Sequence, residues 1–296
     1  MTLELSSDAT ALGVPWAIGD PGRAAGEVPP ARPGREHGHA DIAITSASLP
    51  GMAVRAATVR GILHRASSTP RQDSFALGAT DGGPEDALVA VVADGVGSLR
   101  RSHEAADLVT HSLARSGADG VPWGEAFVHA NDALRRVLEE SPPADGADGM
   151  ATTAVALVLR CDAQGWAGEL AWVGDSACWH LTPDGVWVAL AGVKDGGDEP
   201  YQTGRVEPLP SADGSCQTAS VRVAGGALFL MTDGVSDPLA WSADVQATLA
   251  TWWARPPDMH TFAGQVGFAR KGHMDDRTVI GIWPSGETPD DDDQQG

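Results

Sequence analysis

The chain has 296 residues, and its 40 acidic and 20 basic side chains give it a formal charge of −20. A field of that sign repels phosphate backbones and anionic lipids, so we expect neither nucleic acid nor a membrane surface as a partner. Hydrophobic residues make up 42% of the chain, enough for a sizeable core, but no apolar run approaches the roughly 20 residues that span a bilayer.

The first 50 residues contain six prolines and six glycines and show no sustained periodicity. We therefore expect residues 1–50 to form a disordered or irregular tail. His37 and His39 lie in this stretch, and we interpret them as part of a solvated polar segment because no further metal ligands are nearby. The start of the chain lacks the basic and apolar regions of a signal peptide, and three widely spaced cysteines suit a reducing compartment. We expect a cytoplasmic protein.

The first predicted elements are two strands followed by two helices. Residues 75–77 and 87–93 are short apolar runs bounded by turn residues, which is typical of buried strands. Residues 102–113 have helical periodicity and begin with a serine suited to an N-cap. Residues 122–140 begin with a proline suited to the first turn and repeat apolar residues at helical spacing.

The later elements are mostly consecutive strands. The predicted strands span 152–159, 169–173, 185–190, 227–231 and 278–283, and the predicted helices span 241–254 and 259–269. Consecutive strands favour an α+β fold with antiparallel sheets over a parallel array of alternating strands and helices. We expect one folded domain over 51–284. Residues 285–296 contain four adjacent aspartates whose charges repel, so we expect an acidic disordered tail there.

Aspartates recur at the ends of the predicted strands. Asp94, Asp175 and Asp233 each follow an apolar strand, Asp275 shortly precedes the last one, and Asp73 precedes the strand at 75–77. An aspartate after a strand ordinarily marks a turn. Five in one sheet-rich domain can meet at one edge, where they would repel each other unless a multivalent cation neutralised them. Ligands that are all oxygen favour Mg²⁺ or Mn²⁺ over zinc. The pattern predicts a carboxylate metal site.

Six short motifs carry these aspartates and their surroundings. They are QDSF at 72–75, ADGVGS at 93–98, ATTA at 151–154, VGDS at 173–176, TDGVSD at 232–237 and DDRT at 275–278. This ordered set resembles the motifs of the metal-dependent serine/threonine protein phosphatases of the 2C class. The resemblance covers about residues 55–284. It implies the family's fold, a four-layer α-β-β-α sandwich with two mostly antiparallel sheets.

The resemblance also implies an activity and a set of metal ligands. The activity is hydrolysis of phosphoserine and phosphothreonine on proteins, by direct attack of a water that bridges two Mg²⁺ or Mn²⁺ ions. Asp94 would bridge both ions, and the carbonyl of Gly95 would be a further ligand. Asp233 and Asp275 would complete the shell of the first ion. Asp175 matches an aspartate that holds a third, weaker ion in some members.

Three further residues have implied catalytic roles. Asp73 would hold metal-bound water, and His64 would donate a proton to the leaving group, since imidazole titrates near neutrality. A structural role is the alternative for His64. Arg65 best matches the family's phosphate-binding arginine, and a guanidinium suits a phosphate bidentately. The spacing from Arg65 to Asp73 is longer than the family's pattern, which leaves Arg71 and Arg60 as alternatives.

Four positions depart from the family pattern, namely Gln72, Ala151, Ala177 and Asp276. Gln72 stands where many members have glutamate, and Asp276 stands where asparagine is common. The implied partner is a phosphorylated protein, the enzyme opposing a serine/threonine kinase. An alternative function is that of a non-catalytic pseudophosphatase that binds a phosphorylated partner or regulates a kinase. A phosphatase with an aspartyl nucleophile would need a second acid at Val96, and a Ca²⁺-binding loop would need alternating acids that are lacking here.

Overall fold

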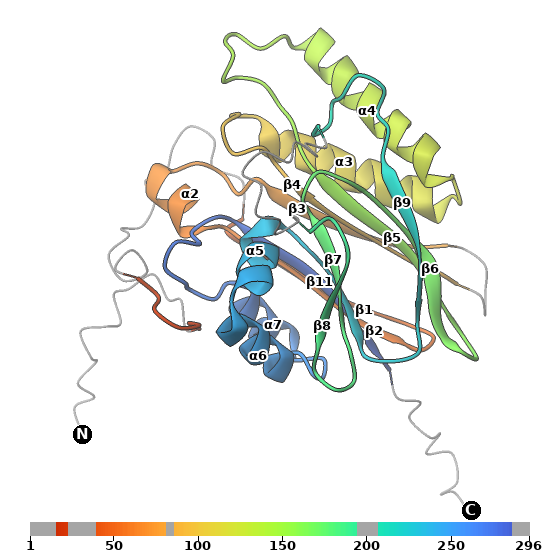
Figure 1. Cartoon of the computed structure of the whole chain (residues 1–296). Helices are drawn as coiled ribbons and strands as arrows, with labels where there is room; N and C mark the ends of the chain where they lie inside the picture. The colour runs from red at the N-terminus through yellow and green to blue at the C-terminus, as the bar shows by residue number, and fades with distance from the viewer. Residues whose placement is uncertain (1–15, 23–39, 81–85, 194–206, 286–296) are drawn as a thin grey trace, which may run out of the picture.

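The computed structural model describes residues 16–22, 40–80, 86–193 and 207–285, and the drawing of the whole chain shows two β-sheets packed face to face (Figure 1). His37, His39 and residues 286–296 lie outside these ranges, so the expectations for them stay predictions. Within the described ranges, no helix has the length and apolarity needed to cross a membrane.

Every strand pairing within the two sheets is antiparallel. The six-stranded sheet contains, in order, β1 (Ile42–Leu49), β2 (Met52–Val59), β11 (Arg277–Pro284), β10 (Ala227–Met231), β7 (Ala177–Leu181) and β8 (Trp187–Ala191). The five-stranded sheet contains β3 (Asp73–Ala79), β4 (Leu88–Asp94), β5 (Ala154–Asp162), β6 (Gly165–Val173) and β9 (Gln217–Val223).

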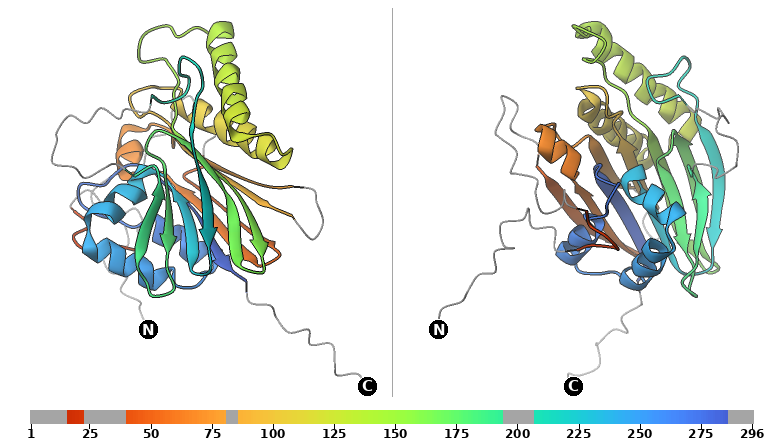
Figure 2. Two further views of the ribbon diagram at one scale, coloured as in Figure 1. Left: turned by 45° about the vertical axis from the view of Figure 1, so that its right-hand side comes forward. Right: turned by 60° about the vertical axis from the view of Figure 1, so that its left-hand side comes forward.

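Helices cover the outer faces of both sheets (Figure 2). The helices α3 (Ser102–Ala118) and α4 (Trp123–Glu140) pack on the five-stranded sheet. The helices α5 (Asp233–Trp241), α6 (Ala243–Trp252) and α7 (Met259–Val266) pack on the six-stranded sheet. The expected α+β fold with a four-layer α-β-β-α arrangement is confirmed.

Burial on two faces explains the apolar runs in the central strands. All the residues of β4 before Asp94 are buried, because one face meets the other sheet and the opposite face meets α3. A strand that is covered on both faces is apolar at every position rather than at alternate ones. The space between the sheets is filled by residues such as Val92, Leu157, Leu230 and Ile280.

The expected irregular tail over 1–50 is wrong for residues 42–49. They form β1, which pairs with β2 over its whole length, from Ile42 opposite Val59 to Leu49 opposite Met52. β1 is an edge strand with half-buried or exposed residues, so its apolar signal is weak. Upstream, Ile18 is 3% exposed and also belongs to the core.

The predicted helix at 241–254 is in fact parts of two helices. α5 begins at Asp233 and ends at Trp241, and α6 begins at Ala243. The start of α5 lies in the Thr232-Asp233-Gly234 sequence, which resembles a turn when it is considered alone. The short helix α2 (Ile62–Ser67) and the strands β2, β7 and β9 were not predicted.

One end of the sandwich collects the strand ends on which the aspartates lie. In the five-stranded sheet the first residue of β3, Asp73, is opposite the last residue of β4, Asp94. In the six-stranded sheet the end of β10 lies beside the start of β11, with Met231 opposite Val279. Hydrogen bonds between the sheets join these ends, as described below.

Candidate metal centre

Asp73 is the buried centre of the acidic cluster and connects the two sheets. It is 3% exposed, and its Oδ2 accepts hydrogen bonds of 2.8 Å from the hydroxyls of Thr232 and Thr278, both at strand ends of the other sheet. Burial raises the pKa of Asp73 well above its ordinary value, and the charges of Asp276 and Asp233 raise it further. The two hydroxyls act in the opposite direction but do not offset these effects.

Asp94 faces three other carboxylates. Burial raises its pKa well above the ordinary value, and the negative charges of Asp73, Asp233 and Asp275 add to the shift. The carbonyl of Asp94 is fixed by the backbone N–H of Thr153 at 2.8 Å. The structure therefore brings Asp73, Asp94, Asp233 and Asp275 together at one end of the sandwich.

Local structure holds the remaining predicted ligands. Asp233 is the first residue of α5, where the helix dipole stabilises its charge. Asp275 precedes β11, and its side chain is 56% exposed. Gly95 follows Asp94, and a Cβ there would lie only 2.7 Å from Cβ of Ser102, so the turn requires glycine. Asp175 lies just after β6, at the same end of the sheet as Asp94.

Asp276 has a role that the sequence did not indicate. It is 2% exposed, and its carboxylate accepts the backbone N–H groups of Gly61 at 2.6 Å and Gln72 at 2.5 Å. Its Oδ1 also lies 2.9 Å from Nδ1 of His64. This one side chain joins the start of β11 to α2 and to the segment before β3.

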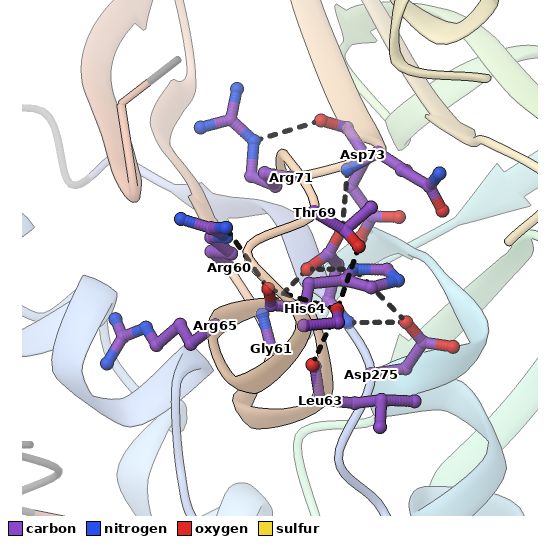
Figure 3. A network of polar contacts seen from close by, with 12 residues as sticks. Arg60, Gly61, Leu63, His64, Arg65, Thr69, Arg71, Asp73 and Asp275 are labelled. Atoms are coloured by element: carbon purple, nitrogen blue, oxygen red, sulfur yellow. Dashed lines mark hydrogen bonds and ion pairs between the residues drawn. The ribbon is translucent and has the colours of Figure 1, made fainter. Parts of the chain in front are cut away.

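His64 lies beside the acids rather than in the solvent (Figure 3). Its Nδ1 is 2.9 Å from Asp276 and 3.7 Å from Oδ1 of Asp275. Burial by itself lowers the pKa of His64, but the contact with Asp276 and the charges of Asp276, Asp275 and Asp73 outweigh it, so the pKa is raised. One ligand atom from each of His64, Asp275 and Asp276 lies within 4.8 Å of the other two, a grouping that can hold an ion.

The three candidate phosphate-binding arginines point away from Asp275 (Figure 3). Nε of Arg65 is 3.6 Å from Asp41, and Arg60 donates to the same carboxylate at 3.0 Å. Arg71 donates to the carbonyls of Asp73 and Ala40. The structure does not bring Arg65 onto the acidic cluster, because Asp41, which we did not consider in the sequence, attracts it.

Gln72 has an unsatisfied acceptor beside the cluster. Its Nε2 donates to the carbonyl of Leu99 at 3.1 Å, while its buried Oε1 has no hydrogen-bond partner among the described residues. Buried polar atoms without a partner are uncommon, and an ion or water often satisfies them. The carboxylates and the orphaned amide oxygen form a set of oxygen donors that fits Mg²⁺ or Mn²⁺, and the imidazole of His64 lies beside it.

The family model for protein phosphatase 2C matches residues 60–265. No curated protein sequence matches the chain.

Three solved structures illustrate the shared fold. The S. agalactiae serine/threonine phosphatase has a TM-score of 0.58 and 17% identity, over 82% of this chain and 100% of its own. RsbX in complex with magnesium has a TM-score of 0.51 and 15% identity, over 82% and 100% of the two chains. The catalytic domain of PstP in complex with two manganese ions has a TM-score of 0.52 and 18% identity, over 79% and 99%.

Proposed function

The chain belongs to the protein phosphatase 2C family, and from this premise we propose that it hydrolyses phosphoserine and phosphothreonine in proteins, with Mg²⁺ or Mn²⁺ as its cofactor. The observation that carries the proposal is the cluster of Asp73, Asp94, Asp233 and Asp275. Burial and the repulsion from the neighbouring acids raise the pKa of Asp94, and a bound cation would relieve that repulsion. The magnesium and manganese complexes of RsbX and PstP support the choice of ions.

The acids at this end of the sandwich would divide the binding of the ions among them. Bound as a pair, the ions would supply an acidified water for direct attack on phosphorus and would offset charge on the phosphoryl group. Asp94 would hold both ions, assisted by the carbonyl of Gly95. Asp233 and Asp275 would hold the first ion, and Asp175 would hold a third, weaker one.

The remaining tasks fall to residues around the ions. Asp73, fixed by its two threonine hydroxyls, orients water through its carboxylate. His64 donates a proton to the leaving alkoxide, and its raised pKa supports this role because it favours the protonated form. Arg65 binds the phosphate after its side chain rotates away from Asp41. The long contact of 3.6 Å between them makes that rotation inexpensive.

The extent and the setting of the domain are also proposals. We place the start of the phosphatase domain at β1 or before it rather than at residue 51, and its end near 284. The substrate is a phosphorylated protein, and the enzyme opposes a serine/threonine kinase. We assign it to the cytoplasm because all three cysteines are unpaired, as a reducing compartment predicts.

A non-catalytic role is the second candidate. The observation that favours it is the pairing of Arg60 and Arg65 with Asp41, which leaves the acidic cluster without a guanidinium directed at it from this group. A pseudophosphatase of this kind would bind a phosphorylated partner or regulate a kinase without turnover.

Hydrolysis assays distinguish the two candidates. The full chain would be incubated with p-nitrophenyl phosphate and with a phosphothreonine peptide, in Mn²⁺, in Mg²⁺ or in EDTA. We expect turnover with either metal and none in EDTA. Absence of turnover with both metals would favour the pseudophosphatase.

Matched variants assign the activity to the cluster. Asp94→Asn should abolish turnover, because Asp94 would hold both ions and its charge would attract each of them. Asp175→Asn should keep most of the activity, since it concerns only the third ion. Asp132→Asn, at an exposed position on α4, is the control. Equal losses in the first two variants would contradict the division of roles.

A further inference from the structure

The segment 16–22 lies along the part of the chain that leads from α7 to the candidate metal centre, and we call it the strap (drawn in red in Figure 1). The N–H of Ala269 donates to the carbonyl of Trp16 at 2.9 Å, and the N–H of Ile18 donates to the carbonyl of Ala269 at 3.2 Å. This exchange is a short parallel pairing between the two segments. Both of them lie outside residues 60–265, which the family model matches.

The two residues after Ala269 also contact the strap. The guanidinium of Arg270 donates to the carbonyl of Ile18 at 3.2 Å and to Oδ2 of Asp244, at the start of α6, at 2.8 Å. The backbone N–H of Lys271 donates to a further carbonyl of the strap at 2.8 Å. The backbone of the strap therefore fixes the path of the chain after α7.

Two apolar side chains anchor the strap. Ile18 is buried in the core beneath the helices of the six-stranded sheet. The ring of Trp16 meets that of Trp252 edge to face, with the ring centres 5.2 Å apart. A Cβ on Gly264 would collide with the indole of Trp16, so α7 needs a glycine there to accept the strap. The seat on α6 and α7 is therefore shaped for this segment.

The residues that the strap holds lead to the candidate metal ligands. The N–H of His273 donates to the carbonyl of Arg270 at 3.1 Å, and Asp275 follows two residues later. Arg277 then donates to the carbonyl of His273 at 2.7 Å and to that of Gly234, at the start of α5, at 2.9 Å. The strap, the loop before β11 and the start of α5 thus form one continuous set of contacts.

We propose that the strap is a detachable clamp of the metal centre, which holds the loop of Asp275 in place when it is seated and lowers the affinity for metal when it leaves. The inference rests on the metal centre of the proposed function. The side chain of Asp275 is 56% exposed, so its position depends on the backbone of its loop more than on side chains packed around it.

The size of the strap allows it to leave its seat. A segment of seven residues with a few backbone hydrogen bonds can open without unfolding the two sheets. The loop before β11 would then sample more conformations. An ion would have to order that loop on binding, and its affinity would fall.

Calorimetric titration of the full chain with Mn²⁺ tests the coupling. Ile18→Glu places a charge in the core and should release the strap, so we expect the Kd for Mn²⁺ to rise by about tenfold. Trp16→Ala removes one anchor and should give a smaller rise. Val128→Glu, at an exposed position on α4 over the other sheet, is the matched control and should bind Mn²⁺ like the wild type.

Amide hydrogen exchange in EDTA reports release of the strap without any metal. The N–H groups of Ala269 and Lys271 donate to the strap, so both should exchange faster in Ile18→Glu and unchanged in the control. If thermal unfolding shows that Ile18→Glu does not fold, Trp16→Ala decides the result. Unchanged exchange in the folded variants overturns the anchoring. Faster exchange with an unchanged affinity for Mn²⁺ overturns the clamp.

A synthetic peptide of residues 16–22 with blocked ends tests whether the segment can return to its seat. At millimolar concentration it should restore the Mn²⁺ affinity of the Ile18→Glu variant towards that of the wild type. The same peptide carrying Ile18→Glu should have no effect. General damage to the fold would not be reversed by a peptide, so absence of rescue overturns the proposal.

The clamp and the proposed function fail in different ways. Mn²⁺ binding that depends on the strap, without hydrolysis of a phosphothreonine peptide, would overturn the function and support the clamp. Hydrolysis together with an equal Mn²⁺ affinity in all variants would overturn the clamp and support the function. A wild type that binds no Mn²⁺ would overturn both.

Discussion

The carboxylate of Asp73 is oriented by a chain of hydroxyl groups. Thr232 and Thr278 both donate to its Oδ2, and the hydroxyl of Thr278 lies 2.6 Å from that of Thr58 on the neighbouring strand. An ionised or water-binding acid that is fixed in this way does not need to reorganise when an ion binds. The free-energy cost of burying this acid among other acids is already present before an ion binds. It takes the form of a raised pKa of Asp73 and a lower stability of the site without metal.

Replacing Gln72 with glutamate should strengthen metal binding. Oε1 of Gln72 has no partner among the described residues, and a charge there would lie near Asp73 and Asp94. The attraction between that charge and a divalent ion exceeds the desolvation cost of the new acid, so we expect Gln72→Glu to lower the metal concentration for half-maximal binding by about tenfold. Calorimetric titration with Mn²⁺ measures it.

The Gln72→Glu variant should be less stable than the wild type in EDTA, because the new carboxylate repels the acids around it. It also faces the carbonyl of Leu99, which accepts a hydrogen bond from Nε2 of Gln72 in the wild type. Gln164→Glu, at an exposed position in the β5–β6 turn, is the matched control. An unchanged or higher metal requirement in Gln72→Glu would show that this side chain does not face the ions.

At the scale of elements, α2 depends on the acid at the start of β11. Asp276→Ala would leave the buried N–H groups of Gly61 and Gln72 without acceptors and His64 without its close partner. We expect the free energy of unfolding to fall by about 3 kcal/mol. Relief of the repulsion between Asp276 and Asp73 offsets only part of this loss. Urea denaturation in EDTA measures the change.

Asp132→Ala is the control for this prediction, because Asp132 is exposed on α4. A loss in Asp276→Ala no larger than in the control would mean that water replaces the carboxylate at low cost, and the link between α2 and β11 would then be unimportant.

Elements covered on both faces were predictable from the sequence, and edge elements were not. β4, β10 and β11 are nearly continuous apolar runs because packing on two sides demands it. β1 lies at a sheet edge, and α2 has only six residues, so neither has a strong periodic signal. Their existence depends on pairing and packing with distant segments.

The residues of the candidate site also separate into those that the sequence predicts and those that it does not. The acids could be predicted because the ends of the apolar strands that carry them could be predicted, and the structure brings Asp73, Asp94, Asp233 and Asp275 together. The pairing of Arg65 with Asp41 could not, since it depends on where β1 starts relative to α2.

At the scale of the whole molecule, the carboxylates of the proposed metal centre come from both sheets. Asp73 and Asp94 belong to the five-stranded sheet, while Asp233 and Asp275 flank strands of the six-stranded sheet. Ions held by Asp94 together with Asp233 and Asp275 would join the two inner layers at one end, where the hydrogen bonds to Asp73 already connect them. Metal binding and the stability of the sandwich should therefore be coupled.

Saturating Mn²⁺ should raise the temperature of unfolding of the full chain in a single transition. A ligand at 100 times its Kd that binds only the folded state adds about 2.7 kcal/mol to the free energy of unfolding. For a domain of this size that corresponds to a rise of about 5–10 °C over the midpoint in EDTA, measured by scanning calorimetry. Asp94→Asn should lose the rise, because the remaining acids cannot hold both ions, and Asp132→Asn should keep it. A rise of equal size in Asp94→Asn would place the stabilising ion outside this cluster, and two separate transitions would show that the sheets unfold independently.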